Sequence, residues 1–260
     1  MEDAVIDAEI GGTPRSAAPE PILVAIDGPA GSGKSSVSRA AAERLEFGIL
    51  DTGAAYRALA WTARRIGLDL DDTAAMETLL DAWTYRITMR GAQHVTVSVT
   101  GGLSAAVPQL TAPTDITAEI RDNAISGQVS RVSKLPVVRE RLNRMFRNAV
   151  ANSGLPGVVI EGRDITTVVA PDAPVRILLT ATPEVRAARR AGELPGLTPE
   201  HVLADLQARD AKDALVVDFM NPAPGVTLVD TSNLNFEQSV QAVVDIVRAA
   251  QGAAEEKSEL

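Results

Sequence analysis

Continuous apolar runs recur along the chain between stretches with helical periodicity. The runs are ILVAID (22–27), FGILD (47–51), GVVIEG (157–162), VRILLT (175–180) and VTLVDT (226–231). Their residues do not alternate between apolar and polar, which is typical of strands buried on both faces of a parallel sheet. The pattern therefore predicts an α/β domain over residues 21–250, with a five-stranded parallel sheet covered by helices.

One segment has a different period. Residues 85–100, YRITMRGAQHVTVSVT, alternate apolar and polar residues around RGAQ, which predicts an antiparallel hairpin. GGLSAAV (101–107) is a candidate third strand, so that residues 84–115 would form a small antiparallel β insert. A long helical stretch is expected over residues 116–151, with Pro136 in the first turn of a new helix.

A glycine-rich loop follows the first apolar run. Gly28, Gly31 and Gly33 let successive backbone N–H groups converge on one anion, and the residues after them have helical periodicity. The spacing fits the phosphate-loop pattern, in which the lysine reaches the outer phosphates and the next hydroxyl binds Mg²⁺. A nucleoside triphosphate is the expected ligand of Gly28, Pro29, Ala30, Gly31, Ser32, Gly33, Lys34, Ser35 and Ser36.

Composition excludes several other classes of function. Much of the formal net charge of -9 lies in residues 1–20 and 251–260, which we expect to be disordered tails, the first of them acidic. No basic helix or aromatic platform indicates binding to a nucleic acid polymer, and no long apolar segment indicates a membrane span. The chain has no cysteine and only two histidines, too few for a cysteine or histidine metal site. We expect a soluble, cytoplasmic protein.

The phosphate loop alone does not distinguish switches, motors and small-molecule kinases. The chain lacks the Asn-Lys-x-Asp and Asp-x-x-Gly motifs of a GTPase. A metabolite kinase needs cations around a second, anionic substrate, because phosphoryl transfer depends on positioning and charge stabilisation. Suitable clusters are DTGAAYR (51–57), SRVSKLPVVR (130–139), EGRD (161–164), RAARR (186–190) and ARDAKD (208–213).

Together these ordered motifs resemble those of bacterial cytidylate kinases, in the nucleoside monophosphate kinase family. The likeness runs from about residue 21 to 250 and rests on the phosphate loop, LDTGAAYR, SKLPVVR, EGRDITTVVAPDAP and the RD pair before Asp213. The antiparallel insert is another shared feature. The resemblance implies a monomeric enzyme that uses ATP and Mg²⁺ to phosphorylate CMP and dCMP.

The resemblance also implies roles for individual residues. Arg57 and Arg163 would hold the acceptor phosphate, Thr52 would lie at the same substrate, and Ser130, Arg139 and Asp164 would read cytosine. Arg209 and Asp213 would bind the ribose hydroxyls. Arg189 and Arg190 would contact the triphosphate from a lid over residues 186–220, and Ser35 would bind the metal. Catalytic roles would fall to Lys34, Arg163, Arg189 and Arg190.

Other interpretations stay open at this stage. Asp51 could simply cap the helix after it, and the arginines of 186–190 could form a solvated helix face. Val216 stands where the family has a lid arginine, and Thr166 where it commonly has glycine. A kinase for another small molecule, or a catalytically weak nucleotide-binding protein, therefore remains an alternative.

Overall fold

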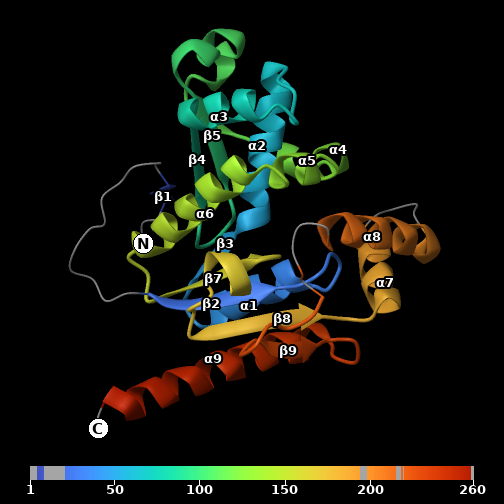
Figure 1. Ribbon diagram of the computed structural model, residues 1–260. Coiled ribbons are helices and arrows are strands. Elements are labelled where there is room, and N and C mark those ends of the chain that lie inside the picture. The colour runs from blue at the N-terminus through green and yellow to red at the C-terminus, as the bar shows by residue number, and fades with distance from the viewer. Residues whose placement is uncertain (1–4, 9–20, 194–197, 215–217, 219, 259–260) are drawn as a thin grey trace. The chain divides into compact units, whose positions relative to one another are not determined.

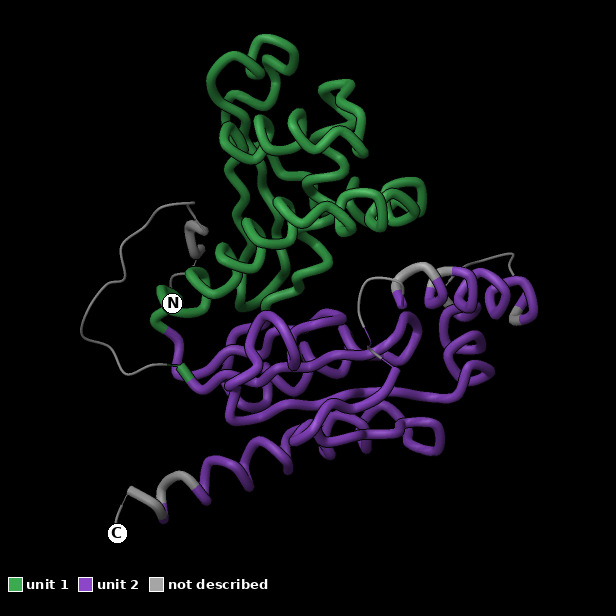
Figure 2. The backbone as a smooth tube through the Cα atoms, in the orientation of Figure 1, with its two compact units in different colours: residues 1–21, 50–154 green, residues 22–49, 155–260 purple. Residues whose placement is uncertain are grey.

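The computed structural model describes residues 5–8, 21–193, 198–214, 218 and 220–258 (Figure 1). The chain divides into two compact units (Figure 2). One is made of residues 1–21 and 50–154, and the other of residues 22–49 and 155–260. We call them the insert unit and the sheet unit.

The sheet unit is built on five strands in the order β3-β7-β2-β8-β9. The strands are β2 (Ile22–Asp27), β3 (Gly48–Asp51), β7 (Gly157–Gly162), β8 (Val175–Thr180) and β9 (Thr227–Asp230). β2 pairs in parallel with both β7 and β8, and β8 pairs in parallel with β9. All five apolar runs thus form strands, and the predicted α/β fold with a parallel sheet is confirmed.

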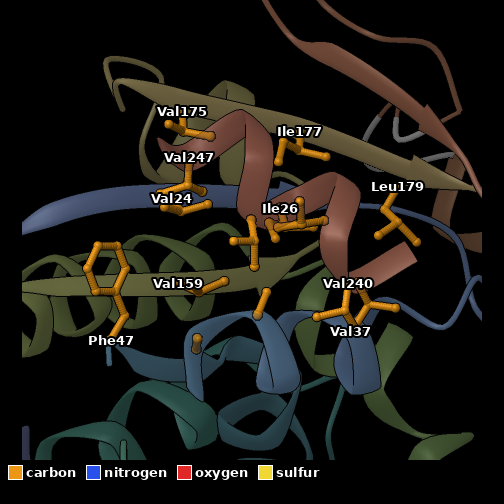
Figure 3. Close-up of a cluster of buried hydrophobic side chains, with 14 of the residues drawn as sticks. Val24, Ile26, Val37, Phe47, Val159, Val175, Ile177, Leu179, Val240 and Val247 are labelled. Carbon is orange, nitrogen blue, oxygen red and sulfur yellow. The ribbon is translucent and has the colours of Figure 1, made fainter. Parts of the chain in front are cut away.

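Helices α1 (Lys34–Arg44) and α9 (Phe236–Ser258) pack on each other and share one apolar cluster with the sheet (Figure 3). In this cluster Val37 of α1 and Val240 of α9 lie with Ile26 of β2 and Ile177 of β8. The contacts explain why the strand runs do not alternate, since all residues of β7 and most residues of β2 and β8 are buried. Helices α7 (Pro183–Glu193) and α8 (Pro199–Ala214) pair with each other beside the phosphate loop.

The insert unit contains a small antiparallel sheet in the order β1-β4-β5-β6. Its strands are β1 (Val5–Ala8), β4 (Trp83–Thr88), β5 (Val95–Val99) and β6 (Thr114–Asp115). The predicted hairpin corresponds to β4 and β5. The predicted third strand is wrong, because GGLSAAV forms the 3-10 helix η1 (Gly101–Ala106), whose glycine, alanine and serine residues have low β-propensity. β6 pairs with β5 instead.

Helices α2 (Thr52–Ile66), α3 (Thr73–Ala82) and α6 (Pro136–Ala151) are the long helices of the insert unit. The helical stretch expected over 116–151, with one interruption at Pro136, is divided further, into η3 (Glu119–Arg121), α4 (Asn123–Ser126), α5 (Val129–Ser133) and α6. Asp122 starts a new turn by accepting a hydrogen bond from the Ala124 N–H at 2.8 Å, and Gly127 ends it. Pro136 opens α6, as predicted.

The two tails are more ordered than expected where the structure describes them. Residues 5–8 form β1, which pairs with the edge of β4 in the register Val5↔Thr88 to Ala8↔Tyr85. Helix α9 continues through residues 251–258, whose alanine and glutamate residues favour a helix that has already begun. The prediction of disorder is therefore wrong for these segments, while residues 1–4, 9–20 and 259–260 lie outside the described part. Among the described helices, none has the length and apolar character needed to cross a bilayer.

Gly157 at the start of β7 gives a test of the sheet packing. A Cβ atom at this position would lie 2.5 Å from the ring of the buried Phe47. We expect Gly157→Ala to lower the free energy of unfolding by about 1–3 kcal/mol through overpacking. Gly252→Ala in α9 is the control, since its Cβ would meet nothing within 4 Å and should stabilise the helix by about 0.5–1 kcal/mol. Denaturant unfolding measures both, and equal stabilities of the two variants would contradict this account.

Candidate functional site

The phosphate loop joins the carboxyl end of β2 to the first turn of α1. Gly31 and Gly33 have φ angles of 76° and 84°, and a Cβ on Gly28 would lie 2.1 Å from the Leu179 carbonyl oxygen. Gly31 and Gly33 are favoured by their positive φ angles. Gly28 is required because the backbone there comes closer to β8 than a Cβ atom would allow. Lys34 is the first residue of α1, where unpaired N–H groups and the helix dipole favour an anion.

Glu161 is a site residue to which the sequence analysis assigned no individual role. Its Oε2 atom accepts a hydrogen bond from Lys34 Nζ at 2.6 Å, and its Oε1 atom accepts one from Ser35 Oγ at 2.6 Å. The register of the parallel pair explains the contact, because Glu161 lies opposite Ile26, two residues before the loop begins. An acid at the end of a buried strand was the only signal in the sequence. The carboxylate is 2% exposed and joins the two loop residues that the motif assigns to phosphate and metal.

Two arginines of α7 donate hydrogen bonds to backbone carbonyls of the phosphate loop. Arg186 is 2% exposed and donates to the Ala30 carbonyl at 3.0 Å. Arg189 donates to the Ser32 carbonyl at 3.1 Å and to Thr231 Oγ1 at 2.9 Å. These bonds rule out a fully solvated arginine face on α7. The contacts of Arg189 and Arg190 with a triphosphate stay predictions.

Arg163 and Asp164 lie between the end of β7 and the π-helical turn η4 (Ile165–Val169), for which Asp164 is the N-cap residue. Arg163 Nη1 lies 3.7 Å from Asp210 Oδ1 on α8. Asp164 is buried, and its carbonyl accepts from the Val168 N–H at 2.9 Å. The sheet unit thus brings the phosphate loop, this pair and α7 to the same region at the carboxyl ends of its strands, where ligands bind in parallel sheets.

The departure at Thr166 has a structural explanation. Asp27, the last residue of β2, accepts from the N–H groups of Ile165 and Thr166 at 2.8 Å each and from Thr166 Oγ1 at 2.6 Å. Burial raises the pKa of Asp27 above its usual value of 3.8, and the hydrogen bonds from Thr166 and Ile165 oppose that shift. A glycine at position 166 would supply only the backbone donor. The threonine hydroxyl therefore ties the turn after Asp164 more firmly to β2.

In the insert unit, Asp51 both caps α2 and holds Arg57. Its Oδ1 atom accepts from the Ala54 N–H at 3.0 Å, and its Oδ2 atom accepts from Arg57 Nη2 at 2.9 Å. Gly53 leaves room for this pair, since a Cβ there would lie 3.0 Å from Arg57 Nη1. Thr52 is buried in the first turn of the same helix. The capping interpretation of Asp51 is correct, and the same carboxylate orients the predicted phosphate-binding arginine.

Tyr85 of β4 lies within electrostatic range of this pair. Burial raises the pKa of Tyr85 well above 10, and the Asp51 carboxylate adds to the effect while Arg57 opposes it. Its hydroxyl has no hydrogen-bond partner among the described residues. Tyr85 is therefore a neutral phenol beside Asp51 and Arg57.

Ser130 and Arg139 lie on α5 and α6 of the insert unit, and α5 packs against α2. An ionic cluster on the surface ties α5 to the segment between α2 and α3. Arg131 Nη2 lies 2.8 Å from Asp69 Oδ1 and 2.5 Å from Asp71 Oδ2, and Lys134 Nζ lies 2.7 Å from Asp71 Oδ1. The cluster fixes the helix that carries Ser130, one of the predicted base-reading residues.

The remaining predicted positions cannot be placed in detail. Arg209 and Asp213 lie on helix α8, but their side chains, like that of Lys212, are not among the described groups. Val216 lies outside the described residues altogether. The ribose contacts and the lid cation thus remain predictions.

Fold and site together define a phosphate-loop kinase: a parallel α/β sheet, a glycine loop with its lysine at a helix N-terminus, and arginines at the neighbouring strand ends. The family model for cytidylate kinase matches residues 24–249. The chain belongs to the cytidylate kinase family.

Curated relatives agree with the family model. The protein named cytidylate kinase from Cutibacterium acnes is 41% identical over 229 residues, which cover 87% of this chain and 96% of the relative. The cytidylate kinase of Streptomyces avermitilis is 38% identical, covering 89% and 95% of the two chains. That of Mycolicibacterium paratuberculosis is 40% identical, covering 87% and 95%. The likeness thus spans nearly the whole length of the relatives.

The ionic cluster on α5 predicts a pH dependence of stability. Hydrogen bonds from Arg131 and Lys134 lower the pKa of Asp71 to about 2 from its usual 3.8. A depressed pKa means that this stabilisation is complete above pH 3.8 and is lost as the pH falls toward 2. We expect Asp71→Asn to be less stable than the wild type at pH 6, with a gap that narrows as the pH falls below about 4.

Urea unfolding between pH 3 and pH 7 measures this gap. Glu77→Gln, an exposed acid of α3, is the control and should show no comparable trend. A difference between Asp71→Asn and the wild type that is constant with pH would contradict the ionic origin.

Proposed function

We propose that this protein transfers the γ-phosphoryl group of ATP to CMP and dCMP, giving CDP and dCDP in pyrimidine nucleotide metabolism. Membership of the cytidylate kinase family over residues 24–249 is the observation that carries the proposal. The geometry of the sheet unit and that of the insert unit each support this proposal. The sheet unit has the predicted loop for the donor phosphates and Asp164, one of the three predicted base-reading residues. The insert unit has the other two, Ser130 and Arg139, and the oriented Arg57.

The residues around the loop fit a Mg²⁺ ion bound with ATP. Magnesium prefers oxygen ligands, and the Ser35 hydroxyl and the Glu161 carboxylate are 2.6 Å apart at the start of α1. Ser35 would hold the metal, and Glu161 is the nearby acid that the sequence left without a role. When bound, the ion would neutralise charge on the phosphate oxygens. Lys34 would move from Glu161 toward the outer phosphates as the triphosphate fills the loop.

Arg57 and Arg163 would bind the acceptor phosphate, because guanidinium forks donate two parallel hydrogen bonds to a dianion. Asp51 pre-orients Arg57, which reduces the rotamer freedom that the arginine loses when the phosphate arrives. A phosphate held in this way lets its oxygen attack the γ-phosphorus in line, with the developing charge shared among the cations.

Cytosine would be recognised by complementary hydrogen bonds. Its exocyclic amine donates, which suits the carboxylate of Asp164, while Ser130 and Arg139 would donate to the ring acceptors. Uracil presents a carbonyl in place of the amine and would face Asp164 acceptor to acceptor. We further propose that the protein acts as a monomer in the cytoplasm.

The acceptor preference gives the direct test of this function. We expect rapid ADP release with CMP and dCMP, and much slower release with UMP and AMP. Uracil lacks the amine from which Asp164 would accept, and adenine has an amine but no carbonyl acceptor for Ser130 and Arg139. A coupled assay at equal acceptor concentrations measures the four rates. A preference for AMP, or no turnover with any of the four, would contradict the proposal.

The variant Asp164→Asn serves as the matched control for base choice. An amide can donate to the uracil carbonyl, so the ratio of kcat/KM for CMP to that for UMP should fall by about tenfold, the equivalent of roughly 1–2 kcal/mol. An unchanged ratio would mean that Asp164 does not read the base, while leaving the kinase assignment intact.

Lys34 and Glu161 allow catalysis and stability to be separated. Lys34→Ala should abolish turnover and also lower the free energy of unfolding by about 3 kcal/mol, because it removes the cation paired with a buried carboxylate. Lys34→Ala combined with Glu161→Gln should recover much of that stability, yet remain inactive. Steady-state kinetics and denaturant unfolding check both. A double variant as unstable as Lys34→Ala would show that the Glu161 charge is not the cause.

A further inference from the structure

Asp210 of α8 lies between two arginines from different segments of the sheet unit. Its Oδ2 atom accepts a hydrogen bond from Arg186 Nη1 at 2.6 Å, and its Oδ1 atom lies 3.7 Å from Arg163 Nη1. Asp210 is 8% exposed. Within the motif ARDAKD, the resemblance assigned Arg209 and Asp213 to the ribose and left Asp210 without a role.

The contacts form a path from the phosphate loop to the predicted acceptor-phosphate arginine. Arg186 Nη1 donates both to the Ala30 carbonyl of the loop, at 3.0 Å, and to Asp210. Asp210 in turn faces Arg163, which follows the end of β7. One carboxylate on α8 thus links the backbone of the donor loop to the side chain of Arg163.

The two oxygens of Asp210 are used differently. Oδ2 has a short hydrogen bond to Arg186, whereas Oδ1 is buried and has no hydrogen-bond donor among the described residues. A buried carboxylate oxygen without a donor is unfavourable, and the Arg163 guanidinium lies 3.7 Å from this oxygen. The charge of Asp210 therefore attracts the Arg163 guanidinium toward α8 over a distance of 3.7 Å.

We propose that Asp210 is a positioning residue for Arg163 in the phosphoryl-transfer reaction. Asp210 restricts the directions that the Arg163 guanidinium can take, so that the arginine is already oriented when the acceptor phosphate arrives. This inference rests on the proposed function, because it takes Arg163 as the residue that binds the acceptor phosphate. It also assigns α8 a role in acceptor binding in addition to the predicted ribose contacts.

A double-mutant cycle between Asp210 and Arg163 tests the proposal. Asp210→Asn keeps the shape of the side chain and an oxygen that can accept from Arg186, but removes the charge that orients Arg163. We expect kcat/KM for CMP to fall roughly 10- to 100-fold, since small displacements of a positioning group have effects of this size. In the Arg163→Ala background the same substitution should cause almost no further loss.

The cycle separates positioning from a purely structural role. If Asp210 only holds α8 against the loop through Arg186, Asp210→Asn will lower kcat/KM by the same factor in both backgrounds, and that result overturns the inference. Arg163→Ala with wild-type activity would instead show that Arg163 does not bind the acceptor phosphate. The role of Arg163 in the proposed function and the inference would then both fail.

Two further variants keep the outcome interpretable. Asp205→Asn changes an exposed acid on the same helix and should leave kcat/KM and the melting temperature at wild-type values. If Asp210→Asn does not fold, Asp210→Glu replaces it in the cycle, because it keeps the charge but moves the carboxylate by one methylene. Non-additivity with Arg163→Ala supports the inference for either variant, and additive losses overturn it.

Discussion

The short contacts of one buried carboxylate organise the phosphate loop. Glu161 accepts from both Lys34 and Ser35 at 2.6 Å, while the parallel register of β2 and β7 determines which side of the sheet it faces. A buried charge without partners is strongly unfavourable, so the pair and the loop conformation stabilise each other. Phosphate oxygens that enter the loop would compete with Glu161 for Lys34. The carboxylate thus occupies, in the structure, the hydrogen-bond donor that the phosphate would use.

Hydrogen bonds from helix α7 also stabilise the phosphate loop. Arg186 and Arg189 of α7 donate to the carbonyls of Ala30 and Ser32, and Arg189 reaches Thr231 at the end of β9. These carbonyls of the loop are satisfied in this way, so they do not compete for the loop N–H groups that the motif assigns to the phosphates. Arginines that look in the sequence like solvent-facing charges on a helix thus act in part as internal hydrogen-bond donors.

A second buried acid supports the turn after β7. Asp27 gathers three donors from Ile165 and Thr166, directly after the pair Arg163 and Asp164. Thr166 stands where the resemblance led us to expect glycine, and its hydroxyl donates a hydrogen bond to Asp27. The threonine therefore adds a hydrogen bond that a glycine could not make, at the turn that follows Arg163 and Asp164.

Local sequence determined much of the architecture. Continuous apolar runs identified all five parallel strands, alternation identified the β4–β5 hairpin, and Pro136 marked the start of α6. These features depend on neighbouring residues and on simple periodicity, which a single chain displays directly. The glycine spacing of the phosphate loop was predictable for the same reason, since its backbone requirements are local.

Pairing between distant segments was decided only by the tertiary structure. β1 pairs with β4, which lies 75 or more positions further along the chain. β6 pairs with β5 at the position where we expected residues 101–107 to form the third strand. The partners of Glu161 and Asp210 depend on strand register and helix packing, which no local pattern encodes. The sequence places charged groups at the ends of strands, but long-range packing decides which of these groups contact one another. The reason is that a buried charge is unfavourable unless it is paired, and its partner comes from a distant segment of the chain.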